Sequence, residues 1–142
     1  MVDISNKSIT KRTAIAQAVL RVGSKKTIEA INENKVPKGD VYEISKAAGY
    51  IGVKKTPEIL PNCHPLPIEH VKVSFSIRGL NISIKMLVIS NYKTGVEVEA
   101  MHGVSTVALN MYDMLKPIDK EIEILNIKLI EKKGGKSDLI NH

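Results

Sequence analysis

The sequence predicts an α+β fold in which helices cover one face of an antiparallel sheet, and three observations lead to it. Apolar and polar residues alternate over 13–22, 71–77 and 82–90, which is the period of strands with one covered face. From 96 to 116 the apolar residues recur at intervals of three and four, as in a long amphipathic helix. The order strand, helices, hairpin, helix, strand then favours one sheet with its helices on the same side.

The first strand is predicted over residues 13–22. One of its faces carries only small or apolar side chains, namely Ala14, Ala16, Ala18, Leu20 and Val22. The other face includes Thr13, Gln17 and Arg21. We predict a strand because this alternation has a period of two, although alanine is a weak strand former.

Two helices are predicted to follow the first strand. Ser24 can act as the N-cap of a short helix over residues 25–34. Asp40 is a second N-cap, for a helix that reaches about Val53. We expect Thr56-Pro57 to interrupt the chain beyond that point, because proline lacks the amide N–H that a helix needs.

The second half of the chain is predicted to contain a β-hairpin over residues 68–90, with its turn at 78–81. Pro117 ends the long helix that follows. A last strand is predicted over 122–130, with an irregularity near Asn126 where the apolar alternation breaks.

These elements form a split β-α-β pattern, for which a ferredoxin-like sandwich is the simplest arrangement. We treat residues 1–142 as one domain, since a chain of this length commonly forms a single core. The segments 1–11 and 132–142 are expected to be flexible. The second face of the sheet carries Ala and Ile rather than uniform charge, so we expect a partner subunit to cover it.

Composition excludes some classes of protein. With 43% hydrophobic and 25% charged residues, the chain is expected to be globular rather than disordered. No apolar run approaches the roughly 20 residues that span a bilayer, so we expect no membrane association and a cytoplasmic location. The one cysteine cannot form an intrachain disulfide, which agrees with a reducing compartment.

The net charge of +6 favours an anionic partner. Nucleic acid is one candidate, but four tyrosines, one phenylalanine and no tryptophan offer few surfaces on which bases can stack. The phosphates of a small ligand are the better candidate.

Three places carry candidate chemistry, and the first is the segment 61–67, where three prolines flank Cys63 and His64. Because proline restricts its own backbone and that of the preceding residue, this loop is stiff and suits a positioned imidazole. A rigid connector is the alternative, with Cys63 as a small buried apolar group and His64 as a structural histidine.

The other two places lie at the ends of the long predicted helix. Glu97 and Glu99 occur at its start, where both can point into one pocket or simply complement the helix dipole. Asp113 and Lys116 are three residues apart near its end, which is the spacing of a solvated ion pair. In a closed cleft the same pair can transfer protons instead.

Four segments, in this order and spacing, carry a resemblance to a known family: Pro61-Asn-Cys-His-Pro-Leu-Pro67, Thr94-Gly-Val-Glu-Val-Glu-Ala100, Met111-Tyr-Asp-Met-Leu-Lys116 and Glu131-Lys-Lys-Gly-Gly-Lys-Ser137. Together they resemble molybdenum cofactor biosynthesis protein C, the cyclic pyranopterin monophosphate synthase family. Met1-Val-Asp-Ile-Ser5 and Lys54-Lys-Thr-Pro57 extend the resemblance over nearly the whole chain.

The resemblance implies a lyase that converts (8S)-3',8-cyclo-7,8-dihydroguanosine 5'-triphosphate to cyclic pyranopterin monophosphate and releases pyrophosphate. It also implies a ferredoxin-like fold and a homohexamer, a trimer of dimers, with active sites at subunit interfaces. Acid-base groups and cations suffice for such a reaction, so no cofactor is expected to be required. A Mg²⁺ ion that travels with the substrate triphosphate is compatible with this expectation.

The resemblance also implies roles for single residues. Asp113 and Lys116 match the catalytic pair. The implied substrate-binding positions are Asn62, Cys63, His64, Glu97, Val98 and Glu99, together with the basic residues Arg12, Lys38, Lys132 and Lys136 near the phosphates. Asn62 and Val98 depart from the leucine and methionine that the family often has, which concerns the fit of the substrate more than the reaction.

Two other functions are considered. A metal enzyme would take its ligands from Cys63, His64, His70, Glu97, Glu99 and His102, but an adjacent Cys-His pair lacks the usual spacing of zinc ligands. A basic nucleic-acid-binding module would use the sheet, yet residues 71–77 offer only Phe75 as an aromatic platform. We therefore expect neither a resident metal nor nucleic acid as the partner.

Overall fold

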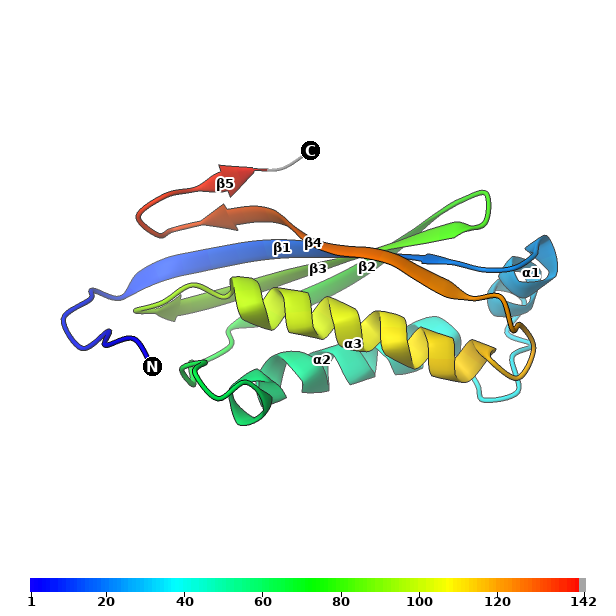
Figure 1. Cartoon of the computed structure of the whole chain (residues 1–142), viewed down its shortest axis with the longest axis horizontal. Coiled ribbons are helices and arrows are strands. Elements are labelled where there is room, and N and C mark those ends of the chain that lie inside the picture. The colour runs from blue at the N-terminus through cyan, green and yellow to red at the C-terminus, as the bar shows by residue number, and fades with distance from the viewer. Residues whose placement is uncertain (141–142) are drawn as a thin grey trace.

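The computed structural model describes residues 1–140 and shows an antiparallel sheet with three helices (Figure 1). The strands are β1 (Thr10–Arg21), β2 (His70–Arg78), β3 (Asn81–Tyr92), β4 (Glu123–Lys133) and β5 (Leu139–Ile140). The helices are α1 (Lys25–Asn32), α2 (Val41–Ile59) and α3 (Glu97–Leu115). Within the described residues the strand order is β2-β3-β1-β4-β5.

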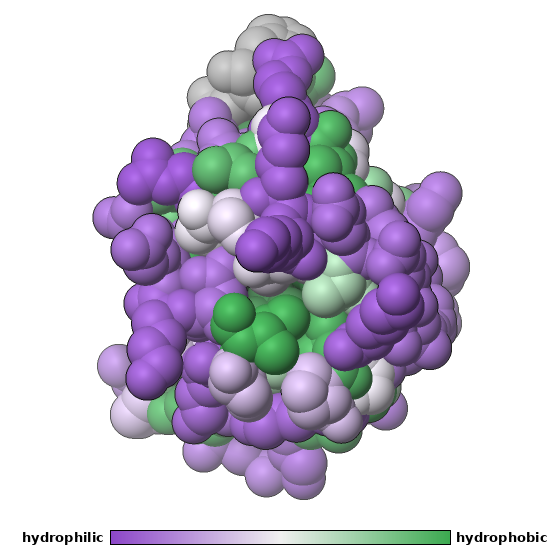
Figure 2. Space-filling model, turned by 90° about the vertical axis from the view of Figure 1, so that its right-hand side faces the viewer, coloured by the Kyte–Doolittle hydropathy of each residue, from purple (hydrophilic) through white to green (hydrophobic). Residues whose placement is uncertain are grey.

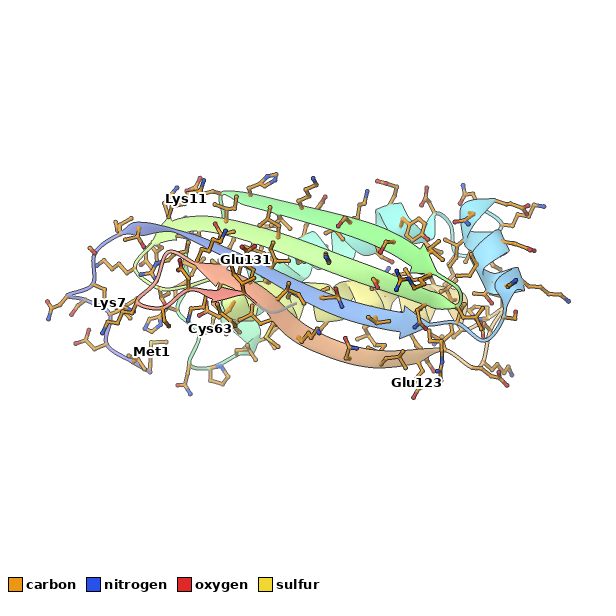
Figure 3. The ribbon with its side chains drawn as sticks, turned by 90° about the horizontal axis from the view of Figure 1, so that it is seen from above. Met1, Lys7, Lys11, Cys63, Glu123 and Glu131 are labelled. Atoms are coloured by element: carbon orange, nitrogen blue, oxygen red, sulfur yellow. The ribbon has the colours of Figure 1, made fainter. Side chains whose placement is uncertain are left out.

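The predicted ferredoxin-like arrangement is confirmed. Strand β1 lies in the middle of the sheet and pairs antiparallel with both β3 and β4, while β2 and β3 form the expected hairpin. In Figure 1, α2 and α3 run side by side along one face of the sheet, and α1 lies at one end. The open face of the sheet is seen in Figure 3.

The covered face of β1 forms the centre of the core, as the alternation predicts. Ala14, Ala16, Ala18 and Leu20 are fully buried beneath the helices. Our expectation that alanine lies on the open face is therefore wrong, because these small side chains are needed where α3 packs against the sheet. The open face instead carries Ile15 of β1 with Leu87 and Ile89 of β3, which are half-buried.

Glycines allow α2 and α3 to pack closely against each other. A Cβ atom on Gly103 would overlap the side chains of Met86 and Val53. One on Gly49 would meet Val107, and one on Gly52 would meet Thr106. The separation of the two helices is therefore set by residues that lack side chains.

The predicted end of the second helix is wrong, because α2 continues through Pro57 to Ile59. Proline removes a single helical donor, the one that would face the carbonyl of Val53. The helical pattern then resumes, since the Leu60 amide donates to the Thr56 carbonyl at 3.0 Å. Asp40 caps the start of α2 as predicted and accepts a hydrogen bond from the Glu43 amide at 3.1 Å.

The irregularity predicted near Asn126 is confirmed by a shift in register between β1 and β4. Asn126 pairs with Val19 and Ile124 pairs with Leu20, so Leu125 is an extra residue in β4. A second shift leaves Ile130 unpaired in the same way, and the sequence pattern did not indicate it.

The expected flexible ends overlap regular structure. Strand β1 begins at Thr10, and β4 continues to Lys133 before turning back into β5. Gly134 adopts a positive φ of 95° in this turn, and its amide donates to Asp138 at 3.0 Å. Lys132 and Lys133, which the prediction included in the flexible C-terminal segment, belong to β4. Residues 141 and 142 lie outside the described residues.

We predict that Gly103→Leu lowers the free energy of unfolding by about 1–3 kcal/mol or more, because the new side chain overlaps Met86 and Val53 in a packed interface. Denaturant unfolding of both proteins measures the difference. Leu109→Ala on the same helix is the control, since Leu109 is 62% exposed and its truncation should change stability by less than about 0.5 kcal/mol. Equal effects of the two substitutions would contradict the close packing.

Candidate active site

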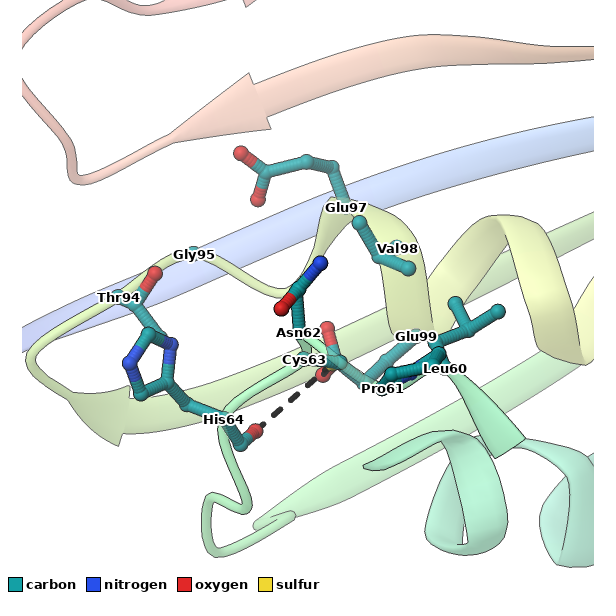
Figure 4. Close-up of a pocket in the computed structure, with 10 residues that line it drawn as sticks. All are labelled: Leu60, Pro61, Asn62, Cys63, His64, Thr94, Gly95, Glu97, Val98 and Glu99. Atoms are coloured by element: carbon teal, nitrogen blue, oxygen red, sulfur yellow. Dashed lines mark hydrogen bonds between the residues drawn. The ribbon is translucent and has the colours of Figure 1, made fainter. Parts of the chain in front are cut away.

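A cavity of about 410 Å³ opens at the N-terminal end of α3 (Figure 4). The loop that follows α2, the connection from β3 to α3 and the first turn of α3 form its walls. Its lining residues are Leu60, Pro61, Asn62, Cys63, His64, Thr94, Gly95, Glu97, Val98 and Glu99. The two substrate-binding segments implied by the resemblance thus lie in one cavity, although 33 positions separate His64 from Glu97 in the sequence.

The Cys63-His64 loop is held at both ends. At its start, the Cys63 amide donates to the Leu60 carbonyl at 3.1 Å, which continues the end of α2 as a turn. At its end, the hydroxyl of Ser90 on β3 donates to the Pro67 carbonyl, and the Glu69 amide pairs with Ile89 at 2.9 Å. These hydrogen bonds fix both ends of the loop, and its prolines restrict the backbone between them.

Glu99 is almost completely buried and contacts Cys63. The thiol of Cys63 donates to Oε2 of Glu99 at 3.3 Å. Burial raises the pKa of Glu99 above its ordinary value, because the charged carboxylate loses hydration. Burial and the neighbouring Glu99 carboxylate also raise the pKa of Cys63, to about 11. Cys63 is thus a protonated donor, and Glu99 can exchange a proton closer to neutral pH than an exposed glutamate does.

Glu97 begins α3 at the mouth of the cavity. One of its carboxylate oxygens pairs with Nζ of Lys132 on β4 at 3.0 Å. The other oxygen, Oε2, is buried and has no hydrogen-bond partner among the described residues. A Cβ atom at position 95 would overlap this carboxylate, so Gly95 provides its space. The free oxygen is available to a ligand that donates a hydrogen bond.

A second cavity, of about 470 Å³, lies at the same end of the molecule and is basic. The N-terminal segment, β1 and the turn before β5 form it, and Lys7, Arg12 and Lys136 line it. Arg12 is only 7% exposed, and its Nη2 donates to the Lys93 carbonyl at 3.2 Å. Its Nε has no partner among the described residues. A buried guanidinium with a free donor suits a phosphate.

The residues that line the two cavities lie at one end of the sheet. In Figure 3, Lys7, Glu131 and Cys63 are at the same end of the sheet, whereas Glu123 is at the opposite end. The Lys132–Glu97 ion pair lies at the mouth of the first cavity and ties β4 to α3. The predicted residues Arg12, Lys132 and Lys136 therefore accompany the Cys63-His64 loop.

The predicted catalytic pair lies at the other end of α3. Nζ of Lys116 is 3.4 Å from Oδ1 of Asp113, and Nζ of Lys38 is 3.3 Å from the same oxygen. Lys38 also donates to the Asp113 main-chain carbonyl at 2.8 Å. Hydrogen bonding by Lys38 and then by Lys116 lowers the pKa of Asp113, so this carboxylate is ionised at neutral pH.

Within one chain, the catalytic pair Asp113 and Lys116 lies far from the cavity that contains Glu99. Fourteen positions of continuous helix separate Glu99 from Asp113, which corresponds to about 21 Å at the helical rise per residue. Asp113, Lys116 and Lys38 are all well exposed, and Figure 2 shows that their end of the molecule is largely hydrophilic. Within one subunit, Asp113 and Lys116 therefore lie outside the cavity that holds the Cys63-His64 loop and Glu99.

The sequence did not point to the helix contacts beneath the first cavity. Thr56 of α2 and His102 of α3 contact each other there, a contact that the sequence analysis did not predict. Asp119, just after the end of α3, accepts hydrogen bonds from the Gly23 amide and the Thr27 hydroxyl and so connects the end of α3 to α1. Polar residues that lie between elements give no periodic signal.

The alternative functions find little support in the geometry. Among residues 1–140, no group of three or more His, Cys, Asp or Glu side chains is placed to hold a metal ion. Phe75 packs against Tyr42 with 4.5 Å between ring centroids, which takes it out of use as a free stacking platform. No helix in the described part of the chain has the length and hydrophobicity of a membrane span.

We predict that Cys63 reacts slowly with iodoacetamide near neutral pH and faster as the pH rises toward about 11, because the thiolate is the nucleophile. Glu99→Gln removes a charge that disfavours the thiolate, so the pKa of Cys63 should fall toward 9.0 and the rate at about pH 8 should increase several-fold. The chain has one cysteine, so mass spectrometry reports this site alone. Glu43→Gln, an exposed change on α2, is the control; a rate unaffected by Glu99→Gln would contradict the contact.

Comparisons with known proteins add to this geometry. The model of the MoaC family matches residues 1–135. A probable cyclic pyranopterin monophosphate synthase of Archaeoglobus fulgidus is 44% identical over 96% of this chain and 92% of its own length. The cyclic pyranopterin monophosphate synthase of Clostridium botulinum is 44% identical over 99% of this chain and 90% of its own. That of Aquifex aeolicus is 43% identical over 96% of this chain, which spans only 54% of that longer protein.

Proposed function

Because the chain belongs to the MoaC family, we propose that it is a cyclic pyranopterin monophosphate synthase of molybdenum cofactor biosynthesis. The reaction is a lyase step that converts (8S)-3',8-cyclo-7,8-dihydroguanosine 5'-triphosphate to cyclic pyranopterin monophosphate and pyrophosphate. The observation that carries the proposal is the cavity in which the Cys63-His64 loop faces Glu97 and Glu99, beside a basic cavity lined by Arg12.

The charges at this end of the molecule support a nucleotide-derived triphosphate as the substrate. The first cavity has a volume within the usual range of small-molecule sites, roughly 300–1,000 Å³. Its carboxylates suit the N–H groups of a purine-derived ring, while Arg12 and Lys136 suit phosphates. In our proposal the ring occupies the first cavity and the phosphates extend toward the second.

We further propose that a second copy of the chain completes the site with Asp113, Lys116 and Lys38. The separation of about 21 Å along α3 supports this, because one chain cannot apply both groups to one substrate. In the composite site Lys116 acts as general acid, and Asp113 orients it or transfers protons. A covering subunit would desolvate Asp113 and move its pKa toward neutrality. The proposed assembly is a hexamer, a trimer of dimers.

No resident cofactor enters this proposal. Proton transfer and phosphate chemistry need acids, bases and cations, which the two ends of α3 supply. A Mg²⁺ ion bound to the triphosphate would enter with the substrate. We place the reaction in the cytoplasm, where the single cysteine stays reduced.

The direct test incubates the purified protein with the cyclised nucleotide triphosphate. Equal amounts of pyrophosphate and pyranopterin product are expected. Pyrophosphate is measured by a pyrophosphate assay, and the pyranopterin is measured by the fluorescence of the oxidised pterin. Asp113→Ala should lower the turnover rate by about 10² to 10⁴, which is the usual effect of losing a proton-transfer group. Near-normal turnover by this variant would remove Asp113 from the mechanism.

Complementation tests the composite site. His64→Ala and Asp113→Ala are each expected to be inactive alone, but chains co-expressed under two affinity tags form mixed pairs. In a symmetric dimer with random mixing, half of the pairs are mixed and each mixed pair has one intact site, so about a quarter of the activity should return.

The control for this experiment pairs two substitutions that belong to the same end. Co-expression of Asp113→Ala with Lys116→Ala should restore nothing, because every site contains a defect. If His64→Ala and Asp113→Ala also fail to complement while mixed oligomers are isolated, the two groups do not come from different subunits, and the composite site is wrong.

A further inference from the structure

His102 contacts α2 directly below the first cavity. It lies on α3, three positions after Glu99 and therefore on the same face of the helix. Its Nδ1 is 2.9 Å from the Gly52 carbonyl oxygen and 2.9 Å from the Thr56 hydroxyl oxygen, both on α2. The proposed reaction assigns no part to this histidine, which lines neither cavity.

The partners of His102 determine which ring nitrogen carries the proton. The Gly52 carbonyl can only accept, so Nδ1 must be the donor to it. The Thr56 hydroxyl donates its own hydrogen to the same carbonyl at 2.8 Å, which leaves its oxygen free to accept from Nδ1. The three groups thus form a closed set of hydrogen bonds between the two helices.

This contact lies at a turn of α2 that lacks one helical hydrogen bond. Pro57 follows Thr56 immediately and provides no N–H for the Val53 carbonyl. The turn that remains, from Thr56 to Leu60, therefore has fewer helical hydrogen bonds than an ordinary last turn. A donor from α3 at Thr56 compensates for this loss where the helix is about to end.

The same turn carries the substrate-binding loop. The Leu60 amide donates to the Thr56 carbonyl at 3.0 Å, and the Cys63 amide donates to the Leu60 carbonyl at 3.1 Å. An unbroken series of hydrogen bonds thus leads from His102 through Thr56 and Leu60 to Cys63. The thiol of Cys63 returns to α3 at Glu99. His102 and Glu99, one helical turn apart on α3, therefore both fix the loop. His102 acts through the end of α2, and Glu99 contacts Cys63 inside the cavity.

We propose that His102 is a positioning residue, which anchors the last turn of α2 and thereby holds the Cys63-His64 loop against Glu99. The anchoring is a statement about this chain's own structure, whereas its consequence for catalysis rests on the proposed function. The competing explanation is that His102 only helps to hold α2 against α3 and has no particular effect on the loop.

The chain offers a matched control for that explanation. Nδ2 of Asn110 on α3 donates to the hydroxyl of Ser45 on α2 at 3.0 Å. This contact joins the same two helices through a hydrogen bond of similar length, about two turns farther along α3. Within residues 1–140, no series of hydrogen bonds connects the Asn110–Ser45 contact to the Cys63-His64 loop, so its loss should loosen the helices without changing the cavity.

The reactivity of Cys63 distinguishes the two roles. Removing a donor that fixes the loop should let it open more often and expose the thiol, so we expect iodoacetamide to modify His102→Leu on the order of tenfold faster than the parent protein. His102→Asn keeps a donor near the position of Nδ1 and should react within about twofold of the parent. Asn110→Leu should match the parent in rate even where its melting temperature falls.

Each result supports or overturns the proposal. A rate for His102→Leu equal to that of the parent overturns it, and so does an equal acceleration in His102→Leu and Asn110→Leu, which would indicate general loosening. Thr56→Val removes the same link from α2 with little change of shape and takes the place of His102→Leu if that variant does not fold. Acceleration is again the expected result.

A catalytic readout separates this proposal from the proposed function. In the synthase assay His102→Leu should raise KM for the nucleotide more than it lowers kcat, because the reacting groups remain and only their placement is disturbed. An inactive parent protein would refute the synthase activity while leaving the alkylation rates, and hence the anchoring, intact.

Discussion

The close contact between α2 and α3 determines where the residues of the first cavity lie. Gly49, Gly52 and Gly103 remove side chains from the interface, so the helices lie nearer to each other than larger residues would allow. The end of α2 then meets the start of α3. A loop that leaves α2 at this point has to cross the first turn of α3. The cavity between Cys63 and Glu99 is thus a consequence of helix packing.

The length of α3 imposes the second constraint. A helix is stiff over its 19 residues, so it keeps Glu99 and Asp113 apart whatever the loops around them do. The carboxylates and the buried arginine gather at one end, and the triad of Lys38, Asp113 and Lys116 lies at the other. A molecule with half of a site at each end can complete both sites by pairing with a second copy in the opposite direction. The apolar residues Ile15, Leu87 and Ile89 on the open face of the sheet agree with such an assembly.

Much of this arrangement could be predicted from the sequence, because its elements have clear periodicity. The alternation around Ala16 and the helical repeat around Val107 identify β1 and α3, and proline places the Cys63-His64 loop between elements. The end of α2 could not be predicted in this way, because local rules place a break at Pro57 and tertiary contacts from His102 and the glycines override it. The distance between Glu99 and Asp113, in contrast, was available from their spacing on one predicted helix.

The environments of Glu99 and Asp113 shift the pKa values of these two carboxylates in opposite directions, and this difference bears on the chemistry. Burial beside a protonated thiol raises the pKa of Glu99, whereas two ammonium groups lower that of Asp113. Groups whose pKa values are moved apart can serve as acid and base at the same pH. In the proposed composite site, Glu99 would therefore hold or exchange a proton at the ring, while Asp113 enters already ionised and paired with Lys116. Desolvation on assembly then weakens the preference of Asp113 for its charge, so the assembly that joins the two halves also prepares Asp113 to accept a proton.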